Sequence, residues 1–140
     1  MLKLSVILIP CLLFLYACTL LSPKAEYIPD NEVLKSATVG VPYRLKIDIL
    51  GGAAFRGTSR KPGFVSPTDS GISIHYCQLS ESEIKDMEPR DSNNYNCVEI
   101  YGTPIKSGVL KITIKGGMYG SMIAPASHFS KDYTLKINQA

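Results

Sequence analysis

Histidine is scarce in this chain, with only two among 140 residues, at positions 75 and 128. Histidine is the side chain best suited to proton transfer near neutral pH. Neither residue lies in a nucleophile elbow, a zinc-protease helix or a glycine-rich phosphate loop. These absences disfavour an enzyme, and we expect a non-catalytic protein that needs no cofactor.

Runs of basic residues are also missing. Lys and Arg number 15 against 12 Asp and Glu, for a net charge of +3 at pH 7, and no cluster of cations could follow the phosphates of a nucleic acid. No CxxC pair occurs, so His75 and Cys77 together offer too few ligands for a structural zinc site. The sequence therefore predicts neither a nucleic-acid partner nor a bound metal.

Helical periodicity is the third absence, since no stretch of ten or more residues has the apolar spacing of an amphipathic helix. The best short candidate is 80–87, where Ser80 and Glu83 would form a capping box. Alternation of apolar and polar residues, typical of half-buried strands, is frequent instead, and glycine or proline separates the segments. It occurs at 43–49, 72–76, 98–100, 110–114 and 133–137. Several short strands in one domain of this length predict an all-β sandwich.

The N-terminus carries the most specific motif. Lys3 precedes an apolar run over 4–15, and the small Ala17 stands just before Cys18, an arrangement typical of a secretory signal peptide. Leu15-Tyr16-Ala17-Cys18 resembles the lipobox of bacterial lipoproteins, in which a diacylglyceryl group is joined to the cysteine thiol and a peptidase then cleaves in front of it. Tyr16 is bulkier than usual, at the permissive middle position.

The lipobox resemblance implies a signal peptide over 1–17 and a palmitate-type acylated N-terminus at Cys18. In Gram-negative lipoproteins, aspartate directly after the cysteine favours retention in the inner membrane. This chain has Thr19, which implies an outer-membrane anchor and a periplasm-facing domain. The alternative is an uncleaved transmembrane helix over 4–21, which is barely long enough to span a bilayer.

The rest of the chain divides into a tether and a domain. Residues 18–32 include two prolines and show no periodicity, so they predict a flexible tether. The domain spans 33–140. Its segments ATVGVPY (37–43), IYGTPIKSG (100–108) and KDYTLKI (131–137) resemble bacterial immunoglobulin-like and cadherin-like repeat modules of surface and envelope proteins. The resemblance implies an immunoglobulin-like fold but not a function, because such modules serve as spacers and as receptors.

Two cysteines remain after Cys11 is removed with the signal peptide and Cys18 is acylated. In an oxidising compartment Cys77 and Cys97 are expected to form a disulfide. They enclose a polar excursion over 77–97 that the repeat modules lack. Strand parity places both cysteines on the outer face at the base of the excursion, where the bond would pin a loop rather than link the two sheets.

Charged loops are the candidate partner-binding sites. The excursion is acidic, while the loop over 55–61 is basic, and together they would make a bipolar surface that docks a protein. The alternative is two ordinary solvated loops. The candidate residues are Glu81, Glu83, Asp86, Glu88, Asp91 and Tyr95 in the excursion, with Arg56 and Arg60 in the basic loop.

Two other segments have open interpretations. The segment 118–123, with two methionines and a tyrosine, forms either a binding patch or padding at the end of the core. The segment 93–96 resembles the Tyr/Asn chemistry of antibody loops or is an ordinary turn.

Two functions compete for the domain as a whole. One is an immunity or inhibitor lipoprotein that neutralises a toxic secreted hydrolase. The other is an accessory or structural subunit of an envelope assembly such as a secretion system, pilus or adhesin. The lone domain with an elaborated loop favours inhibition.

Overall fold

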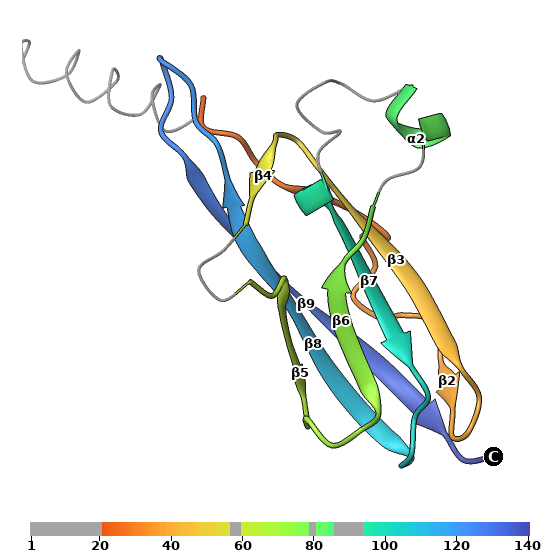
Figure 1. Cartoon of the computed structure of the whole chain (residues 1–140). Coiled ribbons are helices and arrows are strands. Elements are labelled where there is room, and N and C mark those ends of the chain that lie inside the picture. The colour runs from red at the N-terminus through yellow and green to blue at the C-terminus, as the bar shows by residue number, and fades with distance from the viewer. Residues whose placement is uncertain (1–20, 57–59, 79–80, 86–93) are drawn as a thin grey trace, which may run out of the picture.

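The computed structural model of the chain describes residues 21–56, 60–78, 81–85 and 94–140. The described chain is mostly strand, arranged in two layers with very little helix (Figure 1). This confirms the all-β prediction. None of the helices in these ranges is long and apolar enough to cross a bilayer. The expected signal peptide and Cys18 lie outside the described residues.

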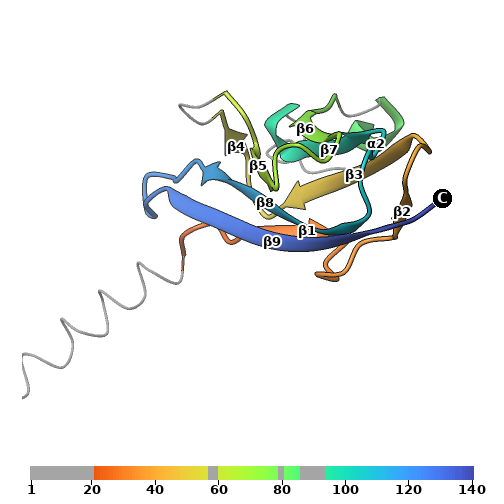
Figure 2. The same ribbon diagram turned by 90° about the horizontal axis from the view of Figure 1, so that it is seen from below.

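One layer is an antiparallel four-stranded sheet in the order β1-β3-β7-β6, referred to below as the first sheet. In Figure 2 it forms the upper layer, except for β1 at its edge. Its strands are β1 (Glu26–Ile28), β3 (Tyr43–Leu50), β7 (Cys97–Gly102) and β6 (Ile72–Tyr76).

The second sheet has five strands, four of them in the order β2-β9-β8-β4, with β5 also paired to β8. Its centre is the long antiparallel ladder between β8 and β9, while β2 runs parallel to β9. The strands are β2 (Ala37–Thr38), β4 (Ala54–Phe55), β5 (Gly63–Ser66), β8 (Gly108–Met118) and β9 (Ser127–Asn138).

The core lies between the two sheets and follows the alternation predicted from the sequence. Successive side chains of a strand point to opposite faces, so the apolar set of each strand faces the other layer. All five predicted strand segments are present. The fully buried apolar side chains include Ile47, Val98, Ile100, Ile112, Ile114, Met118, Tyr133 and Leu135.

The segment expected to be a tether is in part a strand. Within 18–32, β1 pairs with the edge of β3, and Tyr27 lies opposite Ile49. The hydroxyl of Tyr133 donates a hydrogen bond to the Pro29 carbonyl at 2.6 Å, and the Tyr27 ring packs edge-on against Phe129. The prediction of a flexible tether is therefore wrong for these residues, because β3 offers a free edge and Tyr27 has apolar neighbours. Three residues are too few for an alternation pattern.

A short helix occurs where it was expected. Helix α2 (Glu81–Lys85) lies within the predicted segment 80–87, and Ser80 of the expected capping box lies outside the described residues. The excursion returns to the sheet through η2 (Asn94–Asn96), a turn of 3-10 helix that leads directly into β7.

Candidate functional site

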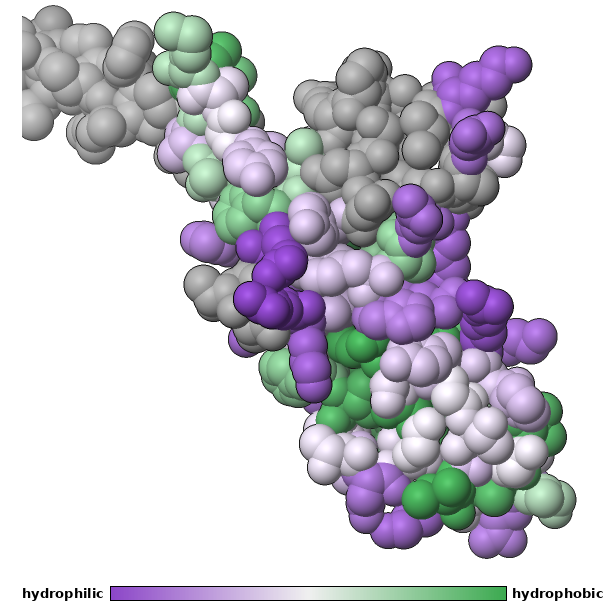
Figure 3. Space-filling view, in the orientation of Figure 1, coloured by the Kyte–Doolittle hydropathy of each residue, from purple (hydrophilic) through white to green (hydrophobic). Residues whose placement is uncertain are grey.

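The outer face of the first sheet brings polar side chains from three strands together. Arg44 on β3 lies opposite Tyr101 on β7, and His75 on β6 lies opposite Glu99 on β7. Because their neighbours along each strand point into the core, these four side chains share the face that points away from the second sheet. Figure 3 shows hydrophilic side chains gathered across the middle of this face and near α2.

The four side chains contact one another and are called the Glu99 cluster below. Arg44 Nε donates a hydrogen bond to Glu99 Oε2 at 2.8 Å, and His75 Nε2 lies 3.0 Å from Glu99 Oε1. The His75 ring stacks on Tyr101 with the ring centroids 4.2 Å apart. The Glu99 side chain is 12% exposed, while that of Arg44 is 79% exposed. The carboxylate is therefore the covered centre of a network whose guanidinium and rings face solvent.

Charge stabilises Glu99 in its ionised form. The pKa of Glu99 lies below its ordinary value mainly because Arg44 donates a hydrogen bond to the carboxylate. The hydrogen bond with His75 also lowers this pKa, whereas partial burial raises it. A carboxylate held by two partners is poorly suited to take up a proton. The Glu99 carboxylate is therefore poorly suited to act as a general base.

The Glu99 cluster should make a measurable part of the stability depend on pH. A carboxyl group with a lowered folded-state pKa stabilises the fold above its unfolded-state pKa and loses that effect as the pH falls through the folded-state value. We expect Glu99→Gln to lower the Tm most at neutral pH, and the difference from wild type to shrink below about pH 4. Thermal unfolding followed by circular dichroism at several pH values measures this difference.

Arg44→Met is the matching variant for the pH experiment, because it removes the hydrogen-bond donor that contributes most to lowering the pKa of Glu99. It should reproduce much of the effect of Glu99→Gln. A difference between Glu99→Gln and wild type that stays constant from pH 7 to about pH 3 would contradict the assignment.

The disulfide Cys77–Cys97 lies on the same outer face, next to the Glu99 cluster. It joins Cys77, directly after β6, to the first residue of β7, with the Cα atoms 5.0 Å apart, and Cys77 N donates to Cys97 O at 2.9 Å. The predicted bond and its place within one sheet are confirmed. Cys97 lies on the outer face and is fully buried there, where η2 packs against β3, β4 and β6 at this end of the sheet. With both sulfurs bonded, Cys77 has no thiolate to bind a metal ion.

Asn96 fastens the return of the excursion. Its side chain is fully buried and makes three hydrogen bonds to the backbone between β3 and β4. The Nδ2 group donates to the carbonyls of Ile49 at 2.7 Å and Gly52 at 2.8 Å, and Oδ1 accepts from Ala54 N at 3.0 Å. For Asn96 the interpretation of 93–96 as an ordinary turn is the correct one, because its side-chain amide is hydrogen-bonded inside the fold.

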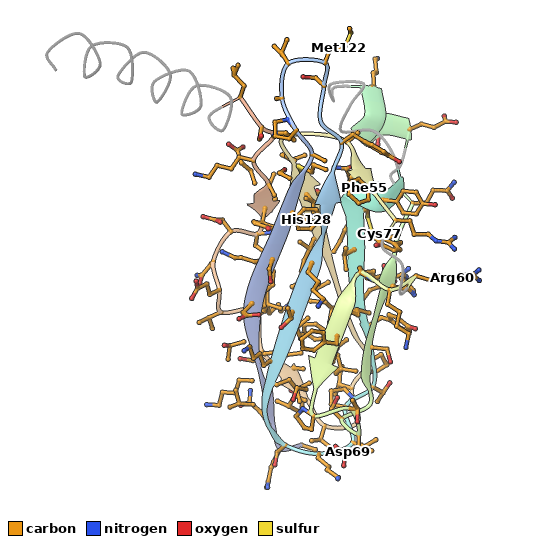
Figure 4. All side chains as sticks on the ribbon, turned by 90° about the vertical axis from the view of Figure 1, so that its left-hand side faces the viewer. Phe55, Arg60, Asp69, Cys77, Met122 and His128 are labelled. Atoms are coloured by element: carbon orange, nitrogen blue, oxygen red, sulfur yellow. A yellow bond between two sulfur atoms is a disulfide. The ribbon has the colours of Figure 1, made fainter. Side chains whose placement is uncertain are left out.

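The predicted partner-binding residues fall into three groups. Glu81, Arg56 and Arg60 are exposed, while Tyr95 is half-buried and packs edge-on against Tyr76, with the ring centroids 5.2 Å apart. Figure 4 shows Arg60 projecting on the side of the molecule on which Cys77 lies. The side chain of Glu83 on α2 and all of Asp86, Glu88 and Asp91 lie outside what the structure describes.

The Glu99 cluster was not among the predicted site residues. The strand parity that places Cys77 and Cys97 on the outer face applies equally to His75, Glu99 and Tyr101. The missing information was the register between strands, which puts His75 beside Glu99 and brings Arg44 from a strand 55 positions away in sequence. Alternation within one strand carries no such information.

The segment 118–123 divides between the two predicted roles. Met118 is fully buried in the core, whereas Tyr119, Met122 and Ile123 are exposed. The padding interpretation holds for the first methionine. The other three side chains form an apolar tip on the turn between β8 and β9.

Metal-binding groups and similarity to known proteins also bear on the site. In the ranges that the structure describes, no three or more His, Cys, Asp or Glu side chains are grouped in a way that could hold a metal ion. No protein-family model, curated protein or solved structure matches this chain.

Proposed function

We propose that this chain is a non-catalytic lipoprotein of the outer membrane, anchored through acylated Cys18, whose periplasmic immunoglobulin-like domain binds a protein partner. The partner class we favour is a toxic secreted hydrolase, which the domain would neutralise as an immunity or inhibitor protein. The observation that carries the proposal is that the Glu99 cluster, the disulfide-held base of the excursion and Arg60 all lie on one side of the first sheet.

Rigidity at the base of the excursion supports a binding role. The excursion leaves β6 and returns to β7, and the disulfide, the Asn96 hydrogen bonds and the packing of Tyr95 on Tyr76 hold these two points. A loop whose ends are fixed loses less conformational entropy on binding. Fixed ends of this kind would suit an excursion that enters the active-site cleft of an enzyme.

The chemistry of the face also suits a protein partner. Tyr101 and Arg44 belong to the residue types that contribute most to protein interfaces, and both are exposed. Arg60, between β4 and β5, and Glu81, at the start of α2, add charges of opposite sign, which would steer and orient a complementary partner.

The open edge of β6 favours the second candidate, a subunit of an envelope assembly. Among the described strands β6 pairs only with β7. A hollow of ≈ 210 Å³ between β6 and β5 is lined in part by Val65, Ile72 and Ile74. A strand from another protein could add to such an edge with its side chains in the hollow.

A capture experiment tests the proposal. The full-length protein, with an affinity tag and in its native membranes, is crosslinked and recovered, and co-purified proteins are identified by mass spectrometry. We expect one partner, recovered in comparable amount, whose hydrolase activity falls when the purified lipoprotein is added. The variant Tyr101→Ala with Arg60→Glu should weaken its capture by about tenfold or more. Its Tm should fall only modestly, because Arg60 is exposed and the Tyr101 ring loses its stacking contact with His75.

Lys136→Glu is the matched control, since it reverses an exposed charge on β9 of the other sheet. It should leave capture unchanged. A partner that binds both variants as well as wild type would remove the outer face of the first sheet from consideration. Recovery of secretion or pilus subunits, with no hydrolase among them, would favour the assembly candidate.

A further inference from the structure

The turn between β8 and β9 displays large apolar side chains at one end of the molecule. Met122 is 104% and Ile123 71% exposed, and Tyr119 and Leu21 are exposed as well. Figure 4 shows Met122 at the extreme tip, at the opposite end from Asp69. Tyr119, Met122 and Ile123, with Leu21 beside them, are called the apolar tip below.

The backbone of the turn is held by its own hydrogen bonds. Ser121 N donates to Ala124 O at 2.7 Å, and Tyr119 N donates to Ala53 O at 3.0 Å. The Tyr119 ring also packs against Phe55, with the ring centroids 5.0 Å apart. Met118, the last residue of β8, is fully buried and fills this end of the core. The apolar groups therefore project from an ordered turn.

The chain that leads to the acylation site lies against this same turn. Leu21 and Pro23 line one hollow together with Tyr119, Gly120 and Ala124, and Ser127 Oγ donates a hydrogen bond to the Pro23 carbonyl. Figure 1 shows the described chain beginning at this end, with its C-terminus at the other.

The distance from Cys18 to the apolar tip is therefore limited. Leu21 is three positions after Cys18, and an extended chain advances at most about 3.6 Å per residue, or about 11 Å in all. Because β1 fixes the chain soon after Leu21, the tether is too short to hold the domain far from the lipid in which the acyl chains lie.

The charges at this end fit an anionic membrane surface. The three segments that meet here, 21–25, 51–56 and 119–128, contain no Asp or Glu but include the cations Lys24 and Arg56. Exposed Met, Ile and Tyr next to basic groups are the composition of segments that enter the headgroup region of a bilayer. Acidic α2 stands at the same end but projects from the opposite side of the molecule (Figure 1).

We infer that the apolar tip inserts into the lipid interface of the membrane that holds the acyl chains, so that the domain docks end-on. The inference rests on the proposed acylation of Cys18 and deepens it. The anchor would then be two-part, covalent lipid plus inserted side chains. The outer face of the first sheet would stand upright from the bilayer, open to a partner that arrives along the membrane.

Tryptophan fluorescence tests the docking, because the chain contains no tryptophan. Met122→Trp places a single reporter on the exposed tip. The full-length acylated protein is reconstituted into vesicles of phosphatidylethanolamine and phosphatidylglycerol whose acyl chains are brominated or not. We expect the emission of Trp at position 122 to shift to shorter wavelength in vesicles and to lose most of its intensity with brominated lipid.

Ile105→Trp is the matched control, since Ile105 is also apolar and exposed but lies before β8, whereas Met122 lies after it. The length of β8, Gly108–Met118, separates the two positions by about 35 Å at ~3.3 Å per residue. Its emission should be that of a water-exposed side chain in both kinds of vesicle.

Each outcome of this experiment has a distinct meaning. Quenching at 122 and not at 105 supports docking. Equal emission of the two variants in both kinds of vesicle, in protein that mass spectrometry shows to be acylated at Cys18, overturns docking and leaves the lipoprotein assignment standing. Protein without acyl chains at Cys18 overturns the assignment itself, and the inference with it.

Discussion

Asn96→Ala is expected to lower the free energy of unfolding by about 4 kcal/mol, because it removes three buried hydrogen bonds at once. The carbonyls of Ile49 and Gly52 and the amide of Ala54 would lose their partner in a site closed to water. Domains are stable by only about 5–15 kcal/mol, so the loss is a large share of the total. Urea unfolding at neutral pH, analysed by linear extrapolation, measures it.

Two further variants separate the hydrogen bonds from the shape of the side chain. Asn96→Asp keeps the shape but removes both donors and buries a charge, so it should be at least as unstable as Asn96→Ala. Asn138→Ala changes an exposed asparagine at the end of β9 and should alter the stability by less than about 0.5 kcal/mol. If Asn96→Asp unfolds at the wild-type urea concentration, the amide donors are not what holds the turn.

Removal of the disulfide is the second large effect that we expect. Cys77 and Cys97 are 20 positions apart, and opening a loop of this length costs about 3 kcal/mol through the greater freedom of the unfolded chain. The double variant Cys77→Ala with Cys97→Ala should lose this amount. It should also lose partner capture, since one end of the excursion would be released from the sheet.

Chemical reduction provides an independent check on the same bond. Wild-type protein unfolded in the presence of a reductant should match the double variant, and the double variant should not respond to the reductant. If reduction leaves the urea midpoint of the wild type where it was, the bond contributes nothing and the excursion is held by Asn96 and the Tyr95–Tyr76 contact alone.

Most of the fold could be predicted from the sequence. The five segments with clear alternation are all strands, because alternation reports directly which side chains of a strand can be buried. The short strands β1, β2, β4 and β5 were not predicted, since two to four residues cannot show a period. These segments become strands because a neighbouring strand offers an unpaired edge. Such an edge exists only once the sheets have assembled.

The candidate site was predicted less completely than the fold. Composition indicated a bonded Cys77–Cys97 pair and exposed charged loops, and the structure contains that bond and leaves Glu81, Arg56 and Arg60 exposed. It could not indicate that Arg44 reaches Glu99 from a distant strand.

The sequence by itself therefore determined the class of the fold and the inward and outward faces of the longer strands, because both follow from local chemistry, and its cysteines indicated the Cys77–Cys97 bond. Only the tertiary structure decided that Asn96 closes a buried turn, that the Glu99 cluster assembles across three strands and that the apolar tip stands beside Leu21. These features join residues that are far apart in the chain, and their contacts depend on register and packing, which no local pattern encodes.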